Sequence, residues 1–461
     1  MTLNSLFRFT ASVIGSLLLI GPAQAAVVHE TVLDDGTAVQ LSSPDAARDK
    51  LGRIHVVAQG VVPGGTDQSV RQIYYMLTDA GGKVLIAPSV VNTGATSRKG
   101  RPRVVLTSDN KAVITVSGGN GQTLPMYYML IDPSLDPTLD GGPLDPAAIV
   151  KAQTNVGVST AVGEHSSAID GSGIVHVIKA ESTNLLHLSF DPVTGTVQTA
   201  EHTVGTNGDK KQPGFGIDSA GKLHVVYQDQ GLNANAPAGY KMLDNTGAVL
   251  IDSTPLFVGT IHPHSAHLSL MIDSRDRVHI VYGDKRNTLD SNSWCNVCES
   301  GGSSFYVELD PSKAPQNGTA SDMATLRVGN EVALGDLWYG RAFMIDGRVH
   351  FISNGHHGRG DFTHKTVSTS GASAPRVIET NSGGLNYSRH YPTVAGSNVI
   401  WAEDVFSPTL AGSTTQIVMA GMGSFSGGSG NSSSGGAMPL GALLLLTFAG
   451  LARRWRARAT V

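Results

Sequence analysis

The sequence predicts an all-β fold, a seven-bladed β-propeller. Two observations carry this prediction. A short motif of Asp, Gly and His recurs along the chain at intervals of roughly 50 to 70 residues, a period typical of solenoids, propellers and arrays. Apart from the two chain ends, no segment shows the 3.6-residue apolar period of a long amphipathic helix.

The motif is clearest at Asp218-Ser-Ala-Gly221-Lys-Leu-His224, where Gly follows Asp after three residues and His follows after six. Asp and Gly supply the side-chain caps and the positive φ that tight hairpins need. The His-bearing strand should therefore begin directly after a turn. Six further copies, some of them incomplete, are Asp49 to His55, Asp109 to Thr115, Asp170 to His176, Asp273 to His279, Asp346 to His350 and Ser397 to Ile400.

A Tyr-bearing segment follows several copies and ends in a second turn, as in Ile73-Tyr-Tyr-Met-Leu-Thr-Asp79. Each unit then predicts four short antiparallel strands, which form one blade of a propeller. Seven units predict seven blades, and six blades are the alternative because the last copy is degenerate. Val27-Val-His-Glu30 precedes the first unit and is predicted to complete the last blade and close the ring.

The recurring His and Tyr side chains are predicted to be structural, because a residue that recurs in most blades serves the blade. Side chains alternate between the two faces of a strand. His224 should therefore pack against a neighbouring blade and bond the repeat Asp or a turn backbone, since a buried polar group needs a partner. The alternative is that one repeat His faces the axis as a catalyst. The residues concerned are His55, His176, His224, His279 and His350.

The composition describes a turn-rich globular protein. The chain has 461 residues, of which 55 are Gly, and its net charge of -4 gives no bias toward nucleic acid. No basic run lies among aromatic residues in the body of the chain, so we expect no nucleic-acid partner. The protein is expected to be a monomer.

The N-terminus, residues 1–25, predicts a secretory signal peptide. It has a basic Arg8, an apolar stretch from Val13 to Ile20 and the cleavage pattern Ala23-Gln-Ala25. Cleavage after Ala25 would leave a propeller of residues 26–423. A membrane anchor is the alternative.

The C-terminus has three parts. Residues 424–436 form a Gly/Ser-rich flexible linker, residues 437–461 begin with an apolar segment, and four arginines follow that segment. Arginines behind a spanning segment stay in the cytoplasm, which leaves the propeller outside. This order of elements resembles the glycine-glycine sorting tails cleaved by rhombosortase, an intramembrane protease. The resemblance implies a Gram-negative bacterium, cleavage near Gly435 and Gly436, and surface display or release. A plain transmembrane anchor is the alternative.

Candidate site residues gather just before the repeat Asp, near the start of the innermost strand of each blade. That end of the strand is expected to line the mouth of the central channel. Converging cations there suit an anionic ligand, and Arg can bind it bidentately. The alternative is that these strand ends are polar only because they are exposed to solvent. The residues are Arg101, Arg103, His165, Lys211, His264, His267, Tyr339, Arg341, Arg389, His390 and Tyr391.

The two cysteines form a single pair, Cys295-Asn-Val-Cys298. In an exported protein such a pair can be a local disulfide. It can also be half of a structural zinc site, completed by His262 and His267. Free thiols are the third possibility.

The repeats, the His/Tyr/Arg mouth and the Cys-x-x-Cys loop resemble the seven-bladed polysaccharide lyases of the ulvan-lyase type. The resemblance implies an anionic polysaccharide as partner and β-elimination at a uronate. An Arg would neutralise the carboxylate, while a His or Tyr would take the proton and another would protonate the leaving oxygen. The expected catalytic residues are His165, His264, His390, Tyr339 and Tyr391, and the expected substrate-binding residues are Arg101, Arg103, Lys211, Arg341 and Arg389.

Two other functions fit the same sequence. A non-catalytic surface propeller would bind glycan or protein with the same mouth, because a fold hosts many functions. Glycoside hydrolysis would need two carboxylates about 5 to 10 Å apart, and none is found at the predicted mouth positions.

Overall fold

The computed structural model describes residues 27–34, 41–61, 70–92, 96–97, 101–117, 126–158, 164–181, 184–206, 213–227, 239–252, 268–284, 303–318, 323–335, 341–354, 362–379, 387–406 and 413–422. The predicted signal peptide, the linker and the C-terminal apolar segment lie outside these residues. In the ranges described, no helix combines the length and the apolar character that a membrane crossing requires.

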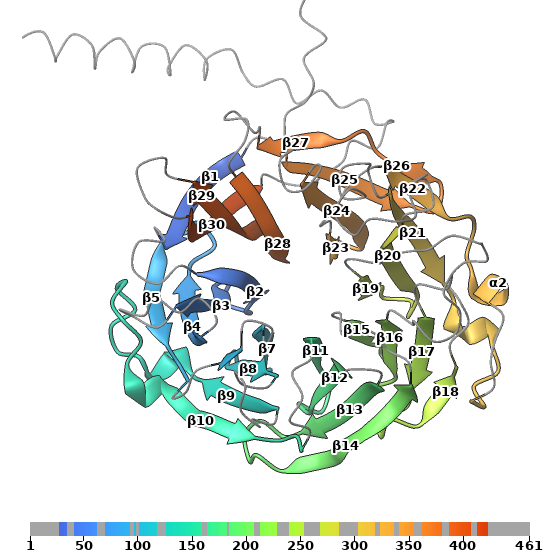
Figure 1. Cartoon of the computed structure of the whole chain (residues 1–461), viewed down its shortest axis with the longest axis horizontal. Helices are drawn as coiled ribbons and strands as arrows, with labels where there is room; N and C mark the ends of the chain where they lie inside the picture. The colour runs from blue at the N-terminus through green and yellow to red at the C-terminus, as the bar shows by residue number, and fades with distance from the viewer. Residues whose placement is uncertain are drawn as a thin grey trace, which may run out of the picture. The chain divides into compact units, whose positions relative to one another are not determined.

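Seven antiparallel sheets follow one another along the chain and surround a central axis (Figure 1). The innermost strands touch in a closed ring, in the order β2, β7, β11, β15, β19, β23, β28 and back to β2. This arrangement is a β-propeller with seven blades rather than six. Because every sheet lies between two neighbours, each blade can bury both of its faces.

The strands of the first four blades have the following bounds. Blade 1 contains β2 (Ser42–Arg48), β3 (Ile54–Val61), β4 (Val70–Thr78) and β5 (Val84–Val90), with the short β6 (Thr96–Ser97) paired to β4. Blade 2 contains β7 (Arg103–Leu106), β8 (Ala112–Val116), β9 (Tyr127–Ile131) and β10 (Ile149–Asn155). Blade 3 contains β11 (Glu164–Ile169), β12 (Val175–Glu181), β13 (Asn184–Phe190) and β14 (Val197–Thr206). Blade 4 contains β15 (Gly214–Ile217), β16 (Leu223–Tyr227), β17 (Gly239–Leu243) and β18 (Val249–Ile251).

The remaining blades complete the ring. Blade 5 contains β19 (Ser269–Ile272), β20 (Val278–Asp284), β21 (Ser303–Leu309) and β22 (Val332–Gly335). Blade 6 contains β23 (Arg341–Ile345), β24 (Arg348–Asn354), β25 (Phe362–Ser368) and β26 (Gly371–Ala372), with β27 (Arg376–Glu379) also paired to β25. Blade 7 contains β28 (Tyr387–Ala395), β29 (Asn398–Phe406), β30 (Ser413–Met422) and β1 (Val27–Asp34). The described helices are single turns: η2 (Pro133–Leu135), η3 (Pro146–Ala148), η5 (Pro311–Lys313) and α2 (Met323–Leu326).

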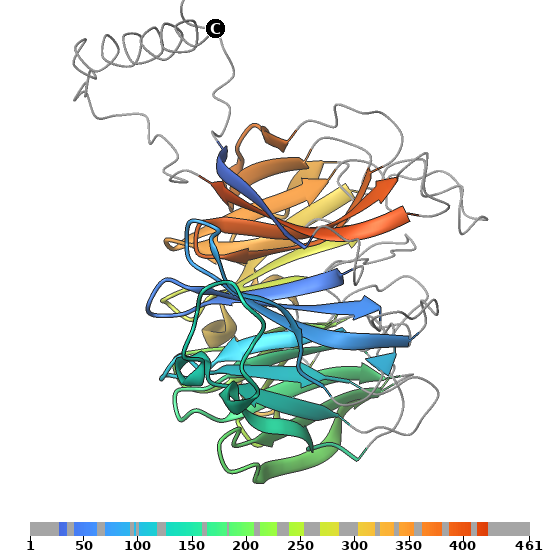
Figure 2. The ribbon, with the colours of Figure 1, turned by 90° about the vertical axis from the view of Figure 1, so that its left-hand side faces the viewer.

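The ring closes through its two ends, as the sequence predicts. β1 pairs with β30 in antiparallel register, with Glu30 opposite Ala420. Figure 2 shows the blue β1 beside the red strands of blade 7. The first and last described strands therefore share one sheet, so neither strand can leave without breaking that sheet.

The core lies between blades rather than within one of them. One apolar cluster joins Tyr240 of blade 4 to Ile280 of blade 5, and another joins Tyr75 of blade 1 to Ile114 of blade 2. All four side chains are fully buried. Each blade therefore depends on its neighbours for burial of its apolar faces.

The repeat motif forms a chain of hydrogen bonds in each complete blade. In blade 4, Oδ1 of Asp218 accepts the backbone N–H groups of Ala220 and Lys222 at 2.9 and 2.8 Å and so caps the turn. Its Oδ2 lies 3.2 Å from Nε2 of His224, and Nδ1 of His224 lies 2.8 Å from the hydroxyl of Tyr240. The prediction that the repeat histidines are structural and bond the repeat Asp is confirmed here. Equivalent chains are Asp49–His55–Tyr75 and Asp170–His176–His187. In blade 5, His279 bonds Tyr306 and its Nε2 lies 3.5 Å from Asp273, and in blade 6 His350 bonds His364.

The second copy of the Asp-Gly-His motif begins two residues earlier in the structure than the sequence predicts. Thr107, rather than Asp109, stands in the place of the repeat Asp, because its Oγ1 accepts the backbone N–H of Lys111 at 3.0 Å. Asn110 takes the place of the Gly with a φ of 66°. Val113 then occupies the His position. The predicted frame is wrong by two residues because Thr and Asn perform the tasks of Asp and Gly.

Asp276 stands in the Gly position of blade 5 and links two blades. Its φ is 59°, and its carboxylate accepts the backbone N–H and the hydroxyl of Ser219 from the turn of blade 4, at 2.8 and 2.6 Å. We expect Asp276→Ala to lower the free energy of unfolding by about 2 kcal/mol, because Ala loses both bonds and disfavours positive φ. Asp276→Gly should cost less, since Gly adopts this φ freely. Urea denaturation of both variants tests this, and equal losses would contradict it.

Candidate functional site

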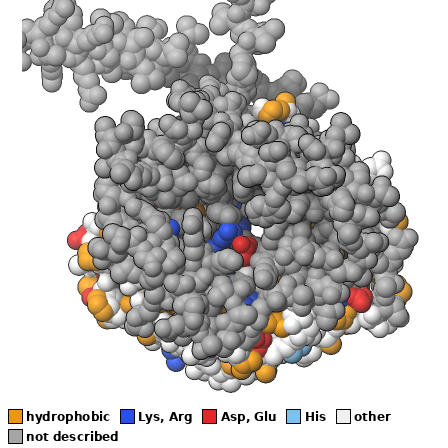
Figure 3. Space-filling model, viewed as in Figure 1, with side chains coloured by type: hydrophobic (Ala, Val, Ile, Leu, Met, Phe, Trp, Pro, Cys, Tyr) orange, Lys and Arg blue, Asp and Glu red, His pale blue; other side chains and the backbone are white. Residues whose placement is uncertain are grey.

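The described candidates lie where the sequence analysis expects them, at the start of the innermost strands. Arg103 begins β7, His165 is the second residue of β11, and Arg341 begins β23. Arg101 comes two residues before β7. Because inner strands run in the same direction in every blade, these residues approach the same end of the channel. Figure 3 shows Lys or Arg and Asp or Glu side chains inside the central opening.

A group of basic side chains connects blades 2 and 3. Nε of Arg103 donates to the backbone carbonyl of His165 at 3.2 Å, so blade 3 holds the guanidinium of blade 2. Lys179 on β12 pairs in register with His165. Arg103 is 6% exposed and Lys179 is 1% exposed. Both basic side chains are therefore buried in a region of low dielectric constant, where charges are screened less than at the surface.

The imidazole of His165 is buried within this group and is 1% exposed. Its Nε2 lies 3.0 Å from Oγ1 of Thr115 in blade 2. Burial, and then the positive charges of Arg103 and Lys179, hold the pKa of His165 well below its usual value. The side chain is therefore neutral at pH 7 and has little contact with solvent.

Carboxylates lie beside this basic group. Arg101 forms an ion pair with Glu164 at 3.4 Å. Asp45 of blade 1 accepts the backbone N–H of Val104 at 3.0 Å. Arg101, Arg103 and Lys179 are the described cations of this region, and Asp45 and Glu164 are described carboxylates beside them.

A cavity of about 470 Å³ follows the inner strands of blades 3 to 7. Phe215, Leu270 and Phe343 are among the side chains that line it. Among the described lining residues the charged ones are Arg341, which begins β23, and Asp346, which directly follows it. Five residue steps of a strand span about 16 Å, so the cavity has a cation at the mouth and a carboxylate far from it.

The structure does not describe the side chains of the other predicted site residues. Lys211, His262, His264, His267, Cys295, Cys298 and Tyr339 lie outside the described residues. For Arg389, His390 and Tyr391 the backbone belongs to β28, the inner strand of blade 7, and only their side chains are outside the description. Within the described part of the chain, no three His, Cys, Asp or Glu side chains are arranged to hold a metal ion.

Sequence reasoning missed Lys179. It lies on the second strand of its blade, whereas the residues predicted from the sequence lie at the starts of the first strands. A signal was present, because a lysine interrupts the apolar run Val175-His-Val-Ile-Lys179-Ala180. A lysine is almost never fully buried unless it has a partner.

No family model matches the sequence, and no curated protein matches it. Solved structures are similar in fold. The polysaccharide lyase Uly1 is 9% identical, with a TM-score of 0.49 over 83% of this chain and 90% of that one. An α-L-arabinanase of Penicillium chrysogenum, complexed with arabinobiose, is 10% identical, with a TM-score of 0.42 over 85% of this chain and 97% of that one. A protein of unknown function from Dyadobacter fermentans is 12% identical, with a TM-score of 0.42 over 86% of this chain and 98% of that one. At these identities the likeness concerns the fold alone.

Proposed function

We propose that this protein binds an anionic polysaccharide, carrying carboxylate or sulfate groups, at the mouth of its central channel and cleaves it by β-elimination. The observation that carries the proposal is the gathering of three basic side chains, Arg101, Arg103 and Lys179, beside the channel. The whole chain has a net charge of -4. A gathering of basic side chains in a chain of negative net charge favours an anionic ligand.

The arginines would have separate tasks. Arg101 is partly exposed and can exchange Glu164 for a ligand anion. Arg341, at the cavity wall, would bind the uronate carboxylate and neutralise it, which makes the adjacent C–H more acidic. His165 is a positioning residue in this scheme, because its carbonyl holds Arg103 while its ring is buried.

The elimination needs a base and an acid. The base removes the proton from the carbon beside the carboxylate, the electron pair forms a carbon–carbon double bond, and the glycosidic C–O bond breaks. The leaving oxygen then takes a proton from the acid. His264, His390, Tyr339 and Tyr391 are the residues we propose for these two tasks.

The other proposals come from the sequence. Export, cleavage of the tail by a rhombosortase-type protease, and a place on the cell surface or outside the cell follow from the two chain ends. A structural zinc at Cys295 and Cys298, with His262 and His267, competes with a disulfide between the two cysteines.

Incubation of the purified protein with a panel of uronate-containing and sulfated polysaccharides tests the proposal. We expect one polymer to give the ultraviolet absorbance of an unsaturated uronate. Arg341→Gln should lower the rate by about 100-fold, because it removes a charge that stabilises the transition state. Lys83→Gln, which removes an exposed cation from an outer turn, should leave the rate unchanged.

Two negative results of this experiment would reject different parts of the proposal. Retention on an anionic polysaccharide column without any absorbance change would reject the elimination and favour the non-catalytic binding propeller. Neither retention nor absorbance would reject the anionic ligand itself.

A further inference from the structure

A groove of about 670 Å³ lies between blades 5 and 6, beside the turns that follow β19 and β23. These turns come at the ends of the inner strands, so the groove is at the opposite end of the ring from the mouth. We call it the 5/6 groove. Blade 5 lines it with Arg275, Arg277, His279, Tyr306 and Glu308, and blade 6 lines it with Gly347, Arg348, Val349 and residues 366–373.

The groove exists because two turns of different length meet. In blade 5, residues 273–277 separate the paired Ile272 and Val278, and blades 1 to 4 have turns of the same length. In blade 6 only Asp346 and Gly347 separate the paired strands. Their φ values of 49° and 71° suit the two-residue hairpin turn that Asp-Gly favours.

Longer turns reach their neighbours in other blades. The backbone N–H of Lys50 in blade 1 donates to Asn110 of blade 2 at 3.1 Å, and Ser219 of blade 4 donates to Asp276 of blade 5. The shorter turn of blade 6 lacks the three residues that would fill this space. The opening is therefore a consequence of turn length.

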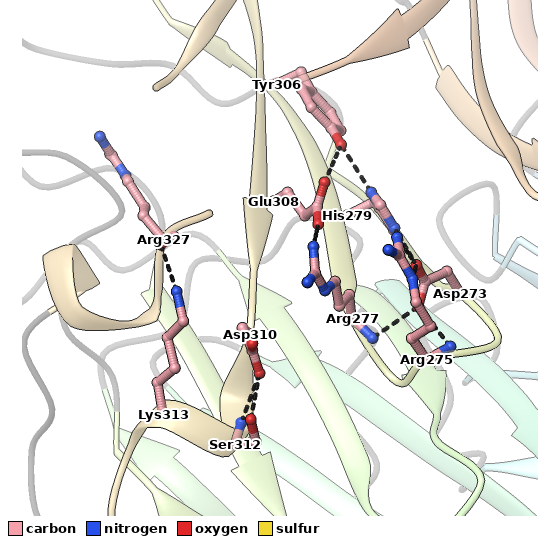
Figure 4. A network of polar contacts seen from close by, with 10 residues as sticks. All are labelled: Asp273, Arg275, Arg277, His279, Tyr306, Glu308, Asp310, Ser312, Lys313 and Arg327. Atoms are coloured by element: carbon pink, nitrogen blue, oxygen red, sulfur yellow. Dashed lines mark hydrogen bonds and ion pairs between the residues drawn. The ribbon is translucent and has the colours of Figure 1, made fainter. Parts of the chain in front are cut away.

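The blade 5 wall is a hydrogen-bonded network (Figure 4). Nη1 of Arg277 lies 2.5 Å from Oε1 of Glu308, and the hydroxyl of Tyr306 donates to the other carboxylate oxygen at 3.4 Å. Nη2 of Arg275 lies 2.7 Å from the carboxylate of Asp273. Glu308 is 7% exposed, so the network holds the guanidinium of Arg277 at a defined position on the wall.

Glu308 is specific to this blade. The residue two positions after the repeat Tyr is Leu77 in blade 1 and Met242 in blade 4. Burying a carboxylate costs free energy unless it is paired. Its presence only beside this groove indicates that the groove, rather than the blade, requires Arg277 to be held in place.

The described residues that line the groove include three arginines, Arg275, Arg277 and Arg348, and one carboxylate, Glu308. Asp273 and Glu308 are each paired with one arginine of the wall. Arg348 from blade 6 is exposed, and no carboxylate of the described residues forms an ion pair with it. Arg275 and Arg277 retain exposed side-chain fractions of 64% and 30%. Guanidinium groups with free edges bind carboxylate and sulfate bidentately.

The facing wall is rich in hydroxyl groups. Thr366, Ser368, Thr369, Ser370 and Ser373 of blade 6 line the groove. Ser368 and Ser370 lie within hydrogen-bonding distance of one another, at 2.8 Å between their Oγ atoms. Hydroxyls that donate and accept in turn match the hydroxyls of a sugar.

We propose that the 5/6 groove is a second binding site, which takes a sugar residue carrying a carboxylate or sulfate. Arg348 and Arg277 bind the anionic group, and the hydroxyls of blade 6 bind the sugar ring. The volume lies in the range of small-ligand sites. The site is separate from the mouth and does not depend on the reaction proposed there.

An NMR titration of the full chain with D-glucuronate, D-glucose 6-sulfate, D-glucose and inorganic sulfate tests the proposal. We expect at least one anionic sugar to bind more tightly than D-glucose and than sulfate. Arg348→Gln should weaken that binding at least tenfold. Replacing the Asp346-Gly347 turn by the five-residue turn of blade 4, residues 218–222, should fill the groove and abolish binding.

Two control variants separate this site from the mouth. Lys50→Gln removes an exposed cation from a turn on the same face, and Arg341→Gln alters the mouth; neither should change the affinity. Loss of binding in Arg341→Gln but not in Arg348→Gln would overturn the assignment to the groove. Equal affinity for sulfate and both anionic sugars would overturn sugar recognition. Selective binding of one anionic sugar would support it and identify the anionic group.

Discussion

His224→Ala is expected to lower the free energy of unfolding by about 3 to 5 kcal/mol. The His224 side chain is fully buried and bonds Asp218 on one side and Tyr240 on the other. Its removal leaves a buried hydroxyl and a buried carboxylate oxygen without this partner, at about 1 to 3 kcal/mol each. It also leaves a cavity, which adds a further cost.

The pKa of Asp218 also indicates that His224 stabilises this hydrogen-bonded chain. Burial opposes ionisation of Asp218, but hydrogen bonds from His224 and from the backbone of Lys222 outweigh it and lower the pKa of that carboxyl. Without His224 the burial cost is less compensated. The carboxylate that caps the turn is then less stable in its charged form.

Urea denaturation followed by circular dichroism measures this effect. Tyr240→Phe is the matched control, because it leaves only Nδ1 of His224 without its partner and creates little cavity, so it should cost about 1 to 3 kcal/mol, less than His224→Ala. Val113 and Ile400 occupy the His position in blades 2 and 7, by register. An apolar residue is therefore accepted where its partners are also changed. A loss below 1 kcal/mol for His224→Ala would contradict a structural role for the repeat His.

The second large effect is loss of stability in acid, beginning near pH 6.5. Burial lowers the pKa of His55, His176, His279 and His350, and burial with the charges of His176 and His202 lowers that of His187 to about 3. These groups bind protons in the unfolded chain near pH 6.5 and stay neutral in the folded one. The unfolded state thus binds more protons, so stability is complete above pH 6.5 and falls as the pH falls.

His187 alone is expected to account for about 2 kcal/mol at pH 5, since each pH unit below 6.5 corresponds to about 1.4 kcal/mol. Below about pH 4 the carboxyls add to the loss. Burial opposes ionisation of Asp273, but backbone and side-chain hydrogen bonds lower its pKa to about 2. Burial raises the pKa of Tyr75 and Tyr306, so a second loss is expected above about pH 10.

Urea denaturation at intervals from about pH 3 to about pH 11 tests this profile. His187→Tyr is the matched variant, because it restores the partner found in blades 1, 4 and 5 and removes one titrating group. Its stability should decline less steeply between pH 7 and pH 5. A flat profile for the wild type over that interval would contradict the assignment of neutral, buried imidazoles.

The predictable part of the candidate site was the position of its residues along the strands. Arg101, Arg103, His165 and Arg341 were expected near the starts of inner strands, and three of them belong to strands that begin there. Their environment was not predictable. The burial of His165 and its bond to Thr115 depend on a neighbouring blade whose side chains approach only in the folded ring.

Features that depend on residues close in sequence were determined by the sequence itself. The turn at Asp218, the positive φ of Gly221 and the short turn at Asp346 arise from hydrogen bonds and backbone preferences spanning a few residues. The number of blades followed from counting these turns. Such information is local, so it can be read without coordinates.

Features that depend on distances across the ring were decided only by the tertiary structure. The register of blade 2, with Leu106 opposite Ala112, assigned the cap to Thr107. The burial of Lys179 and the 5/6 groove between Arg277 and Arg348 likewise required two segments to be brought side by side. Burial and charge balance are properties of neighbouring segments in space, and a linear pattern contains no such distances.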